Sequence, residues 1–413
     1  MSTPWPEDGL SVSGGAWEAG RMLSRVYRSV LVVSALVLVA GACSSPGAGQ
    51  AAAKPTSTTA SDVLTAKSTA TPAAATKITH IFLINLENED FTSSWGPSSP
   101  AKYLNGTLRP QGALLTQYFA IGHVSLDNYI AQISGQSPNH DTNTDCVKYV
   151  NFVSTGTGAY GQALGQGCVY PASVKTIGDQ LHAKGLTWKA YEEDIANSTT
   201  EPKTCRHPPI GAPDPTIVAT KTDMYATRHD PWVYFHSIID SPACKTEVVG
   251  LNVLPTDLAS AATTPNLSYI TPNVCDDGHD SPCKDGRPGG LVSADAFLKL
   301  WVPKILASPA YKAGGMLIIT FDEAAVGKDG DSTACCHTPP SPNSPLPGLT
   351  GPGGGRVGAL VLSSLTKPNT TSVTPYNHYS LLCSMENVFG LTHLGFAGAP
   401  DLSCFGKDVY NEP

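Results

Sequence analysis

Apolar runs typical of strands alternate with segments typical of helices beyond residue 77, and this alternation is the feature that most constrains the fold. The run Ile-Thr-His-Ile-Phe-Leu-Ile-Asn-Leu at 78–86 is continuous enough to be a strand buried on both faces. Strands are expected at 78–86, 114–119, 186–191, 267–270, 315–321 and 357–362, and helices at 126–134, 174–183, 293–306 and 379–389. Such alternation predicts an α/β sandwich with a largely parallel central sheet.

The N-terminus reads as a secretory signal. Arg21, Arg25 and Arg28 precede an apolar run at 30–42 that is shorter than the roughly 20 residues of a membrane-spanning helix. The run ends in Ala-Gly-Ala-Cys43, which resembles a bacterial lipobox. We therefore expect residues 1–43 to be a signal peptide that leaves a lipid anchor on Cys43. Plain secretion after an ordinary cut is the alternative.

A tether is expected next. Residues 44–77 are rich in Ala, Thr, Ser and Pro and contain almost no large apolar side chain. Such a stretch cannot bury enough surface to fold, so we expect it to be disordered. The folded catalytic domain is then expected at 78–413.

The formal net charge of the chain is −8. A protein that binds nucleic acid usually carries more basic than acidic residues, so this charge argues against a nucleic-acid partner.

The cysteines indicate an oxidising, extracellular compartment. The chain has 11 Cys, more than a cytosolic protein usually carries. Without Cys43 they form pairs of sequence neighbours, namely Cys146/Cys168, Cys205/Cys244, Cys275/Cys283, Cys335/Cys336 and Cys383/Cys404. Sequence does not fix the connectivity, and Cys335 and Cys336 can also bond to two different partners. A zinc site is the competing interpretation, but the sequence has no Cys-x-x-Cys pair.

Two predicted strands end in oxygen-bearing side chains. The first is followed by Glu87-Asn88-Glu89-Asp90, and the strand at 315–321 by Asp322-Glu323. Ligands of open α/β sheets bind at the carboxyl ends of the strands. Converging carboxylates and an amide there would bind a hard divalent cation. Solvated turns are the alternative, because these residue types are common after strands.

Ser125 lies between these two segments, immediately before a predicted helix. One interpretation is a helix N-cap. The other is a nucleophile, since a helix N-terminus attracts phosphate and an adjacent metal lowers the pKa of a hydroxyl. The sequence lacks a Gly-x-Ser-x-Gly elbow, which disfavours a lipase-type acyl hydrolase.

Several separated motifs resemble, in type and order, the bacterial phosphoesterase family of secreted acid phosphatases and phospholipases C. The nearest resemblance is to secreted mycobacterial acid phosphatases that act on phosphoinositides. The motifs lie at 81–88, 123–129, 134–135, 278–280, 320–323 and 376–379. The resemblance covers nearly all of 78–413 and implies an alkaline-phosphatase-like α/β/α sandwich, which disulfides would staple.

The resemblance also implies a divalent metal cofactor of open identity, with Ca²⁺, Mg²⁺, Mn²⁺, Zn²⁺ and Fe all compatible with oxygen ligands near histidine. The implied metal ligands are Glu87, Asn88, Ser125, Asp322 and Glu323. Ser125 is also the implied nucleophile.

Histidines and one amide complete the implied site. His279 or His229 would transfer protons to and from the reacting oxygens. Asp280 would orient His279. Asn128, His123 and His378 match positions predicted to bind the substrate.

The chain departs from the family pattern beside the nucleophile. The family usually reads His-Pro-Ser-Leu-Pro-Asn-Tyr, whereas Val124 and Asp127 stand in place of the two prolines here. Asp90 stands where the family favours a small polar residue. Asp90 and Asp127 therefore add negative charge near a site for an anion.

We expect a secreted or surface-anchored phosphoesterase that hydrolyses phosphomonoesters through a phosphoserine. A phospholipase C-type diesterase would use the same residues and is the first alternative. A ligand-binding lipoprotein without turnover is the second. The expected partner is a phosphorylated small molecule or lipid headgroup, and the membrane if Cys43 is lipidated.

Overall fold

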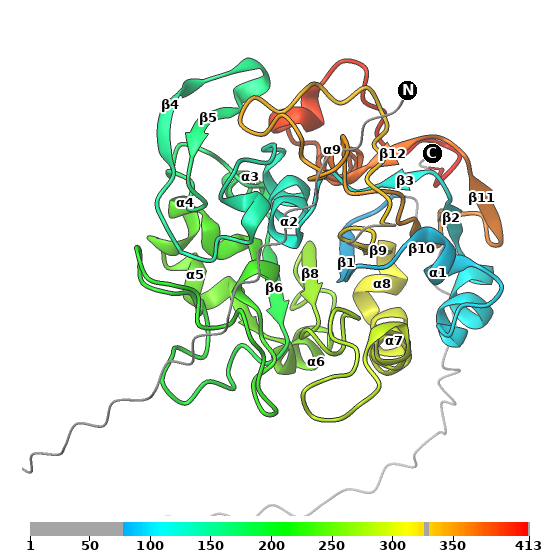
Figure 1. Cartoon of the computed structure of the whole chain (residues 1–413). Coiled ribbons are helices and arrows are strands. Elements are labelled where there is room, and N and C mark those ends of the chain that lie inside the picture. Colours follow the sequence, from blue (N-terminus) through cyan, green and yellow to red (C-terminus); the bar gives the residue numbers. More distant parts are fainter. Residues whose placement is uncertain (1–76, 326–329, 412–413) are drawn as a thin grey trace, which may run out of the picture. The chain divides into compact units, whose positions relative to one another are not determined.

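The computed structural model describes residues 77–325 and 330–411 (Figure 1). The predicted signal peptide, Cys43 and the tether up to residue 76 lie outside the described residues, so their assignments stay predictions. Across the described ranges, none of the helices combines the length and apolarity that crossing a bilayer requires.

An eight-stranded sheet forms the centre of the fold, in the order β11-β2-β10-β9-β1-β8-β6-β7. The strands from β9 to β7 are mutually parallel, and β10 runs antiparallel to both of its neighbours. The strands are β1 (His80–Leu86), β2 (Ala113–Leu115), β6 (Trp188–Glu192), β7 (Val248–Gly250), β8 (Leu267–Thr271), β9 (Gly315–Phe321), β10 (Ala359–Ser363) and β11 (Thr370–Ser372). The predicted α/β fold with a largely parallel sheet is confirmed.

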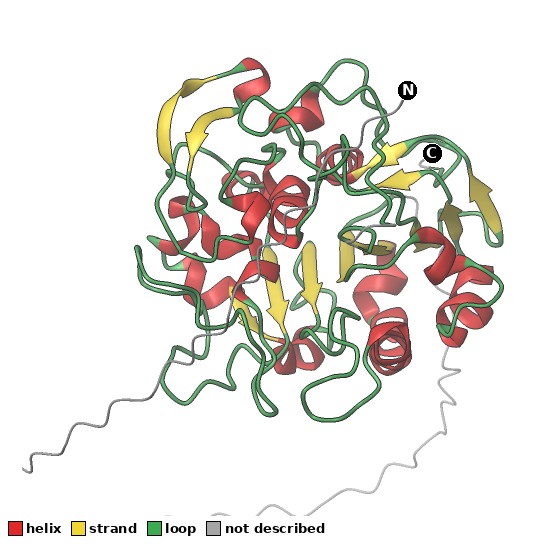
Figure 2. Cartoon of the chain, viewed as in Figure 1, coloured by secondary structure: helices red, strands yellow, loops and turns green. Residues whose placement is uncertain are grey.

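Helices lie on both sides of this sheet (Figure 2). Successive residues of a strand point to opposite faces. On β1, Asn85 accepts a hydrogen bond from Gln132 of α2, whereas the ring of Phe82 packs 6.5 Å from that of Tyr311 of α8. Helices α2 and α8 therefore cover opposite faces. The helices are α1 (Phe91–Trp95), α2 (Ser125–Ser134), α3 (Ile177–Ala183), α4 (His236–Ile239), α5 (Ala243–Glu247), α6 (Leu254–Asp257), α7 (Gly290–Ala307), α8 (Pro309–Gly314) and α9 (His378–Phe389).

Two predicted elements differ from the observed ones. The strand expected at 114–119 is divided, because β2 stays in the main sheet while β3 (Tyr118–Phe119) pairs with β12 (Tyr376–Asn377). The helix expected from 174 begins at Ile177, because Thr176 and Asp179 form a reciprocal capping box. A hairpin of β4 (Val153–Thr157) and β5 (Ala163–Gln166) was not predicted.

Five disulfides join the neighbouring cysteines in the expected pairs: Cys146–Cys168, Cys205–Cys244, Cys275–Cys283, Cys335–Cys336 and Cys383–Cys404. The prediction of a disulfide-stapled domain is confirmed.

Candidate active site

The pairing of β1 with β9 builds the first part of the site. Leu86 lies opposite Phe321 in the parallel register, so the residues that follow both strands meet at one edge of the sheet. The backbone N–H of Asn88 donates to Asp322 Oδ1 at 3.1 Å, and its side-chain amide donates to Glu323 Oε1 at 3.2 Å. Asn88 has φ of +49°, a left-handed conformation that Asn tolerates better than most residues. The turn therefore brings the two predicted ligand pairs together.

Ser125 is the first residue of α2 and faces this cluster. Its hydroxyl donates to Glu87 Oε2 at 2.9 Å, and the residue is 2% exposed. The N-cap position belongs to Val124, which offers no side-chain cap. The N-cap interpretation of Ser125 is therefore wrong, because the hydroxyl is directed at a carboxylate and not at the free N–H groups of its own helix.

His229 is buried against the other side of Glu87. Its Nδ1 lies 3.1 Å from Asp277 Oδ2, and its Nε2 lies 3.6 Å from Glu87 Oε1. Tyr129, one turn after Ser125, donates a hydrogen bond to the same Glu87 oxygen. Burial lowers the pKa of His229 well below its usual value, so the ring is held neutral.

Asp277 is a site residue that sequence reasoning missed. It is fully buried, its backbone carbonyl accepts from the N–H of Glu87 at 3.0 Å, and its side chain meets His229. With Glu87 and His229 it forms a group whose ligand atoms all lie within 4.8 Å of one another. The signal was its place in the Cys-Asp-Asp-Gly-His-Asp run, but nothing in that run distinguishes Asp277 from its acidic neighbours.

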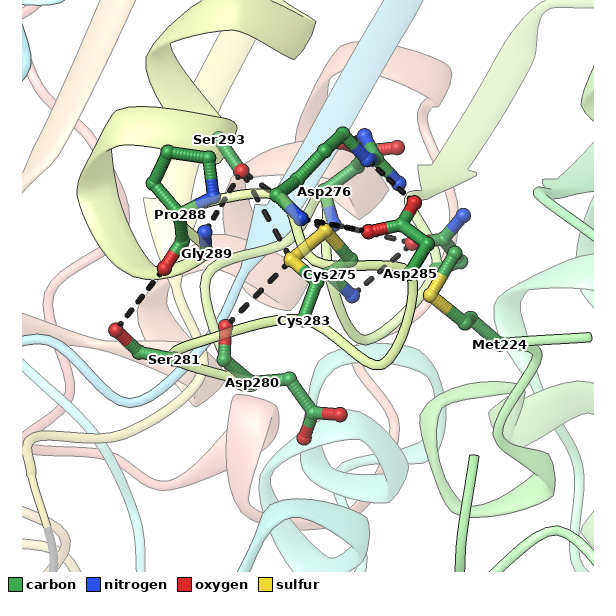
Figure 3. The surroundings of a disulfide bond; sticks show 12 residues. Met224, Cys275, Asp276, Asp280, Ser281, Cys283, Asp285, Pro288, Gly289 and Ser293 are labelled. Carbon is green, nitrogen blue, oxygen red and sulfur yellow. Dashed lines mark hydrogen bonds and ion pairs between the residues drawn. A yellow bond between two sulfur atoms is a disulfide. The ribbon is translucent and has the colours of Figure 1, made fainter. Parts of the chain in front are cut away.

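A disulfide closes the loop that carries His279. Cys275 and Cys283 bracket the loop, and Figure 3 shows the bond with the surrounding side chains. His279 Nδ1 lies 2.9 Å from Asp280 Oδ1, as expected for an orienting carboxylate. That contact with His279 lowers the pKa of Asp280. The His279 and His229 rings are 5.6 Å apart.

The predicted substrate-binding residue Asn128 is engaged with the loop before Ser125. Its Oδ1 accepts from the N–H groups of Ile121 and Gly122 at 2.8 and 3.1 Å, and its Nδ2 donates to the carbonyls of Gly122 and Val124. These bonds fix the loop that leads into α2. A direct contact with phosphate stays a prediction.

His123 and His378 contact the acidic pair Asp322 and Glu323 that follows β9. His123 Nδ1 contacts Glu323 Oε2, and its Nε2 lies 3.2 Å from the carbonyl oxygen of Asp331. His378 Nε2 lies 2.5 Å from the carbonyl oxygen of Asp322, and burial lowers the pKa of His378 to about 4. Both contacts are with the protein itself, and substrate binding by either residue stays a prediction.

The carboxyl groups of the cluster are buried close together, so ionising all of them at once is unfavourable. Burial, reinforced by neighbouring acids, raises the pKa of Glu87, Asp277 and Glu323 well above their usual values. Burial raises the pKa of Asp322 to about 7. Buried acids that cannot all ionise together are stabilised by an added positive charge.

Among the residues that the structure describes, two buried oxygen atoms of the cluster, Asn88 Oδ1 and Asp322 Oδ2, have no hydrogen-bond partner. Buried polar atoms are rarely left unpaired in native proteins. Oxygen atoms of this kind beside two further carboxylates are the ligands of hard divalent cations. The residues at this edge of the sheet therefore fit a bound divalent metal.

Asp127, which departs from the family pattern, is 1% exposed. Its carboxylate accepts a hydrogen bond from Asn143, while its Oδ1 has no partner within residues 77–325 and 330–411. Burial, followed by the nearby Asp145, raises the pKa of Asp127 well above its usual value. The negative charge expected from this substitution is therefore strongly disfavoured.

Comparison with known proteins finds a phosphoesterase family and relatives that are named as phosphatases. The sequence profile of the Phosphoesterase family matches residues 101–392. A phosphate-repressible acid phosphatase of Penicillium chrysogenum is 26% identical over 310 residues, which cover 75% of this chain and 58% of that protein. The chain thus spans less than two thirds of the fungal relative. A phosphatidylinositol-3-phosphatase of Mycobacterium tuberculosis is 24% identical over 393 residues, which cover 94% of this chain and 97% of that protein.

Among solved structures, a protein of the alkaline phosphatase superfamily from Vibrio parahaemolyticus aligns with a TM-score of 0.42 and 12% identity. The alignment covers 77% of this chain and 68% of that one.

Proposed function

The chain belongs to the phosphoesterase family, and from this premise we propose that it is a metal-assisted acid phosphatase that hydrolyses phosphomonoesters through a phosphoserine on Ser125. The matched family and the relatives named as acid phosphatases support this class of reaction. The observation that carries the proposal is the 2.9 Å hydrogen bond from Ser125 to Glu87, within a buried cluster of oxygen ligands.

Glu87, Asn88, Ser125, Asp322 and Glu323 would hold the divalent metal. When bound, such an ion supplies positive charge that favours the ionised serine and offsets the charge of the transferred phosphoryl group. In the resting protein the hydroxyl of Ser125 donates a hydrogen bond to Glu87, which fixes the direction of the Oγ atom. Ser125 Oγ bonds to the phosphorus atom as its proton passes to Glu87, and the bond from phosphorus to the alcohol oxygen of the substrate breaks. Water then displaces Ser125 from phosphorus, and Oγ recovers its proton.

His279 is proposed as the group that protonates the leaving oxygen and then activates water. Asp280 accepts from its Nδ1, and the substrate would displace Arg228 from Nε2, which then carries the moving proton. The exposed fraction of the His279 side chain is 29%, so the ring is accessible to substrate and solvent. His229 is buried and neutral, and we assign it contact with the phosphate instead. Asn128 would bind phosphate only after exchanging one of its loop contacts.

We also propose that the protein works outside the cytoplasm, secreted or anchored at the surface. Five disulfides in the described domain support an oxidising compartment. The proposed substrate class is a phosphorylated small molecule or a lipid headgroup, which the relative named for phosphatidylinositol 3-phosphate supports.

The test compares p-nitrophenyl phosphate with bis-p-nitrophenyl phosphate, using wild type and Ser125→Ala, with and without chelator, from acid to neutral pH. Ser173→Ala, at an exposed turn, is the matched control. We expect monoester turnover that falls by at least about 10³-fold in Ser125→Ala and disappears with chelator. Turnover of the diester alone would move the assignment to a phospholipase C-type enzyme. Absence of both activities with metal supplied would favour a ligand-binding protein.

A further inference from the structure

A small pocket lies beside His279 and outside the acid cluster. Its volume is about 140 Å³, well above the 10–15 Å³ that one water molecule needs. Its lining combines charged and apolar side chains: Thr216, Ile217, Val218, Ala219, Arg228, Val274, His279, Asp280 and Lys284. The pocket therefore has room for a chemical group of several atoms.

Arg228 is the buried charge of this pocket. The residue is 5% exposed, its Nη2 donates to His279 Nε2 at 3.2 Å, and its Nε lies 3.5 Å from Asp145 Oδ2. Its Nη1 is buried and has no hydrogen-bond partner in the described part of the chain. A guanidinium is an obligate donor with a fork that matches carboxylate and phosphate oxygens. The Nη1 atom is therefore a buried donor that suits a carboxylate or phosphate oxygen.

Lys284 adds a second positive charge to the lining. It is exposed and forms no ion pair within 77–325 and 330–411. The one carboxylate in the lining, Asp280, is occupied by His279 at 2.9 Å. The apolar side chains of Ile217 and Val218 form part of the wall, and apolar walls strengthen attraction between charges. Arg228 and Lys284 thus set two positive charges against the single negative charge of Asp280 in the lining.

Arg228 also connects this pocket to the nucleophile helix. Asp145 pairs with Arg228 through Oδ2 and accepts the N–H of Leu126 at 3.0 Å through Oδ1. Leu126 follows Ser125 directly. The next residue after Arg228 is His229, which contacts Glu87. The pocket is thus linked through Arg228 and Asp145 to the first turn of the helix that begins at Ser125.

We propose that this pocket is a subsite for a second acidic group on the substrate, with Arg228 and Lys284 as its specificity-determining residues. The inference rests on the proposed phosphatase function and narrows its substrate class to phosphomonoesters whose alcohol portion carries a further phosphate. That phosphate can belong to a soluble bisphosphate or to a phosphorylated lipid headgroup. The chemistry that the pocket recognises is the same in both.

The first experiment measures kcat and KM for 1,3-propanediol bisphosphate and for its monophosphate, in wild type, Lys284→Gln and Arg228→Lys. Lys299→Gln, on the exposed side of α7, is the control. We expect the wild type to prefer the bisphosphate. Lys284→Gln should raise KM for the bisphosphate by about two- to fivefold and leave that for the monophosphate unchanged. Arg228→Lys should reduce the preference about tenfold, because the fork is lost.

A binding measurement separates failure of the pocket from failure of the proposed function. Calorimetry on Ser125→Ala needs no turnover and should show tighter binding of the bisphosphate, weakened by Lys284→Gln. Equal affinities for both compounds, or equal effects of Lys284→Gln on both, would overturn the subsite even if monoesters are hydrolysed. Loss of monoester turnover with the binding preference intact would instead overturn the catalytic assignment.

The two sources of the second phosphate are compared with dihexanoyl phosphatidylinositol 3-phosphate beside the soluble bisphosphate. A Lys284-dependent preference in either arm supports the subsite and identifies the source. If the preference does not depend on Lys284 in either arm, the subsite is contradicted.

Discussion

The imidazole of His229 lies parallel to the phenol ring of Tyr129, with ring centroids 5.4 Å apart and planes inclined by 5°. Both side chains also meet Glu87 at the same oxygen, Tyr129 by a hydrogen bond and His229 at 3.6 Å. Ser125 contacts the other oxygen of Glu87. The stacked pair thus fixes the carboxylate that Ser125, the proposed nucleophile, faces.

Tyr129→Phe should therefore weaken metal binding while keeping the stacked ring. Removing the donor to Glu87 frees the carboxylate to rotate, and loss of a group that orients a ligand typically costs about 10- to 100-fold in metal affinity. Titration of the chelated protein with metal, followed by calorimetry, measures the effect. Tyr311→Phe, whose ring packs on the opposite face of the sheet, should bind metal like wild type. Equal affinity in the two variants would contradict the role of Tyr129.

Asp277→Asn should reduce kcat more than it raises KM. Asp277 holds Nδ1 of His229 at 3.1 Å, so the amide would disturb the orientation and tautomer of the ring. We expect a loss in kcat on the order of 10²-fold. Steady-state kinetics with p-nitrophenyl phosphate gives the two constants. Asp276→Asn, one residue earlier and partly exposed, is the control. A variant with unchanged kcat would remove Asp277 from the site.

Chelation should destabilise the protein more at pH 8 than at pH 5. Without a cation, the folded-state pKa of Asp322 is raised to about 7, and those of Glu87, Asp277 and Glu323 are raised as well. The folded state then binds more protons than the unfolded state, so stability falls as pH rises from about 4 through 7. A bound cation removes this dependence. The difference in Tm between metal-loaded and chelated protein should widen by about 5–10 °C over this range. A difference independent of pH would count against the cation site.

Glu386→Gln should change the pH dependence of stability without touching the site. Burial raises the pKa of Glu386, on α9, to about 9, so ionisation opposes folding from about pH 4.5 up to that value. The free energy of unfolding of the variant, relative to wild type, should therefore rise by about 2–3 kcal/mol between pH 5 and pH 7. Urea denaturation at several pH values measures it. The exposed Asp401→Asn should show no such trend.

Removing the Cys275–Cys283 bond should cost both stability and activity. The bond closes a loop with a sequence separation of 8 that carries Asp277 and His279. Chain-entropy arguments give about 2–3 kcal/mol for a loop of this length. Cys335–Cys336 has a separation of 1 and closes no such loop. We expect the double serine variant at 275 and 283 to lower Tm and kcat, and that at 335 and 336 to leave the unfolding free energy nearly unchanged.

Local sequence patterns were sufficient for most of the central fold. The continuous apolar runs of β1 and β9 identify buried strands, and the oxygen-rich residues after them lie where open α/β sheets bind ligands. The breaks in other elements depend on tertiary partners. The strand expected at 114–119 divides because Tyr118 finds its partner in Tyr376, more than 250 residues away.

The site was predictable to the extent that its residues follow strands or begin helices. Asp277 was not, because its role depends on the loop that turns it toward His229 and not on its neighbours in sequence. The contacts of Asn128 with backbone amides and of His378 with a backbone carbonyl could not be predicted from the sequence either. Residue type and spacing indicate which chemistry is available, whereas the direction of each side chain requires the folded chain.

The hydrogen bond from Asn88 to Glu323 spans a sequence separation of 235 residues. During synthesis the first pair of acidic and amide ligands emerges long before the second. A nascent chain that ends before Glu323 therefore cannot bring the two proposed ligand pairs together. The proposed cation site would thus form only together with the pairing of β1 and β9, two strands at the centre of the sheet.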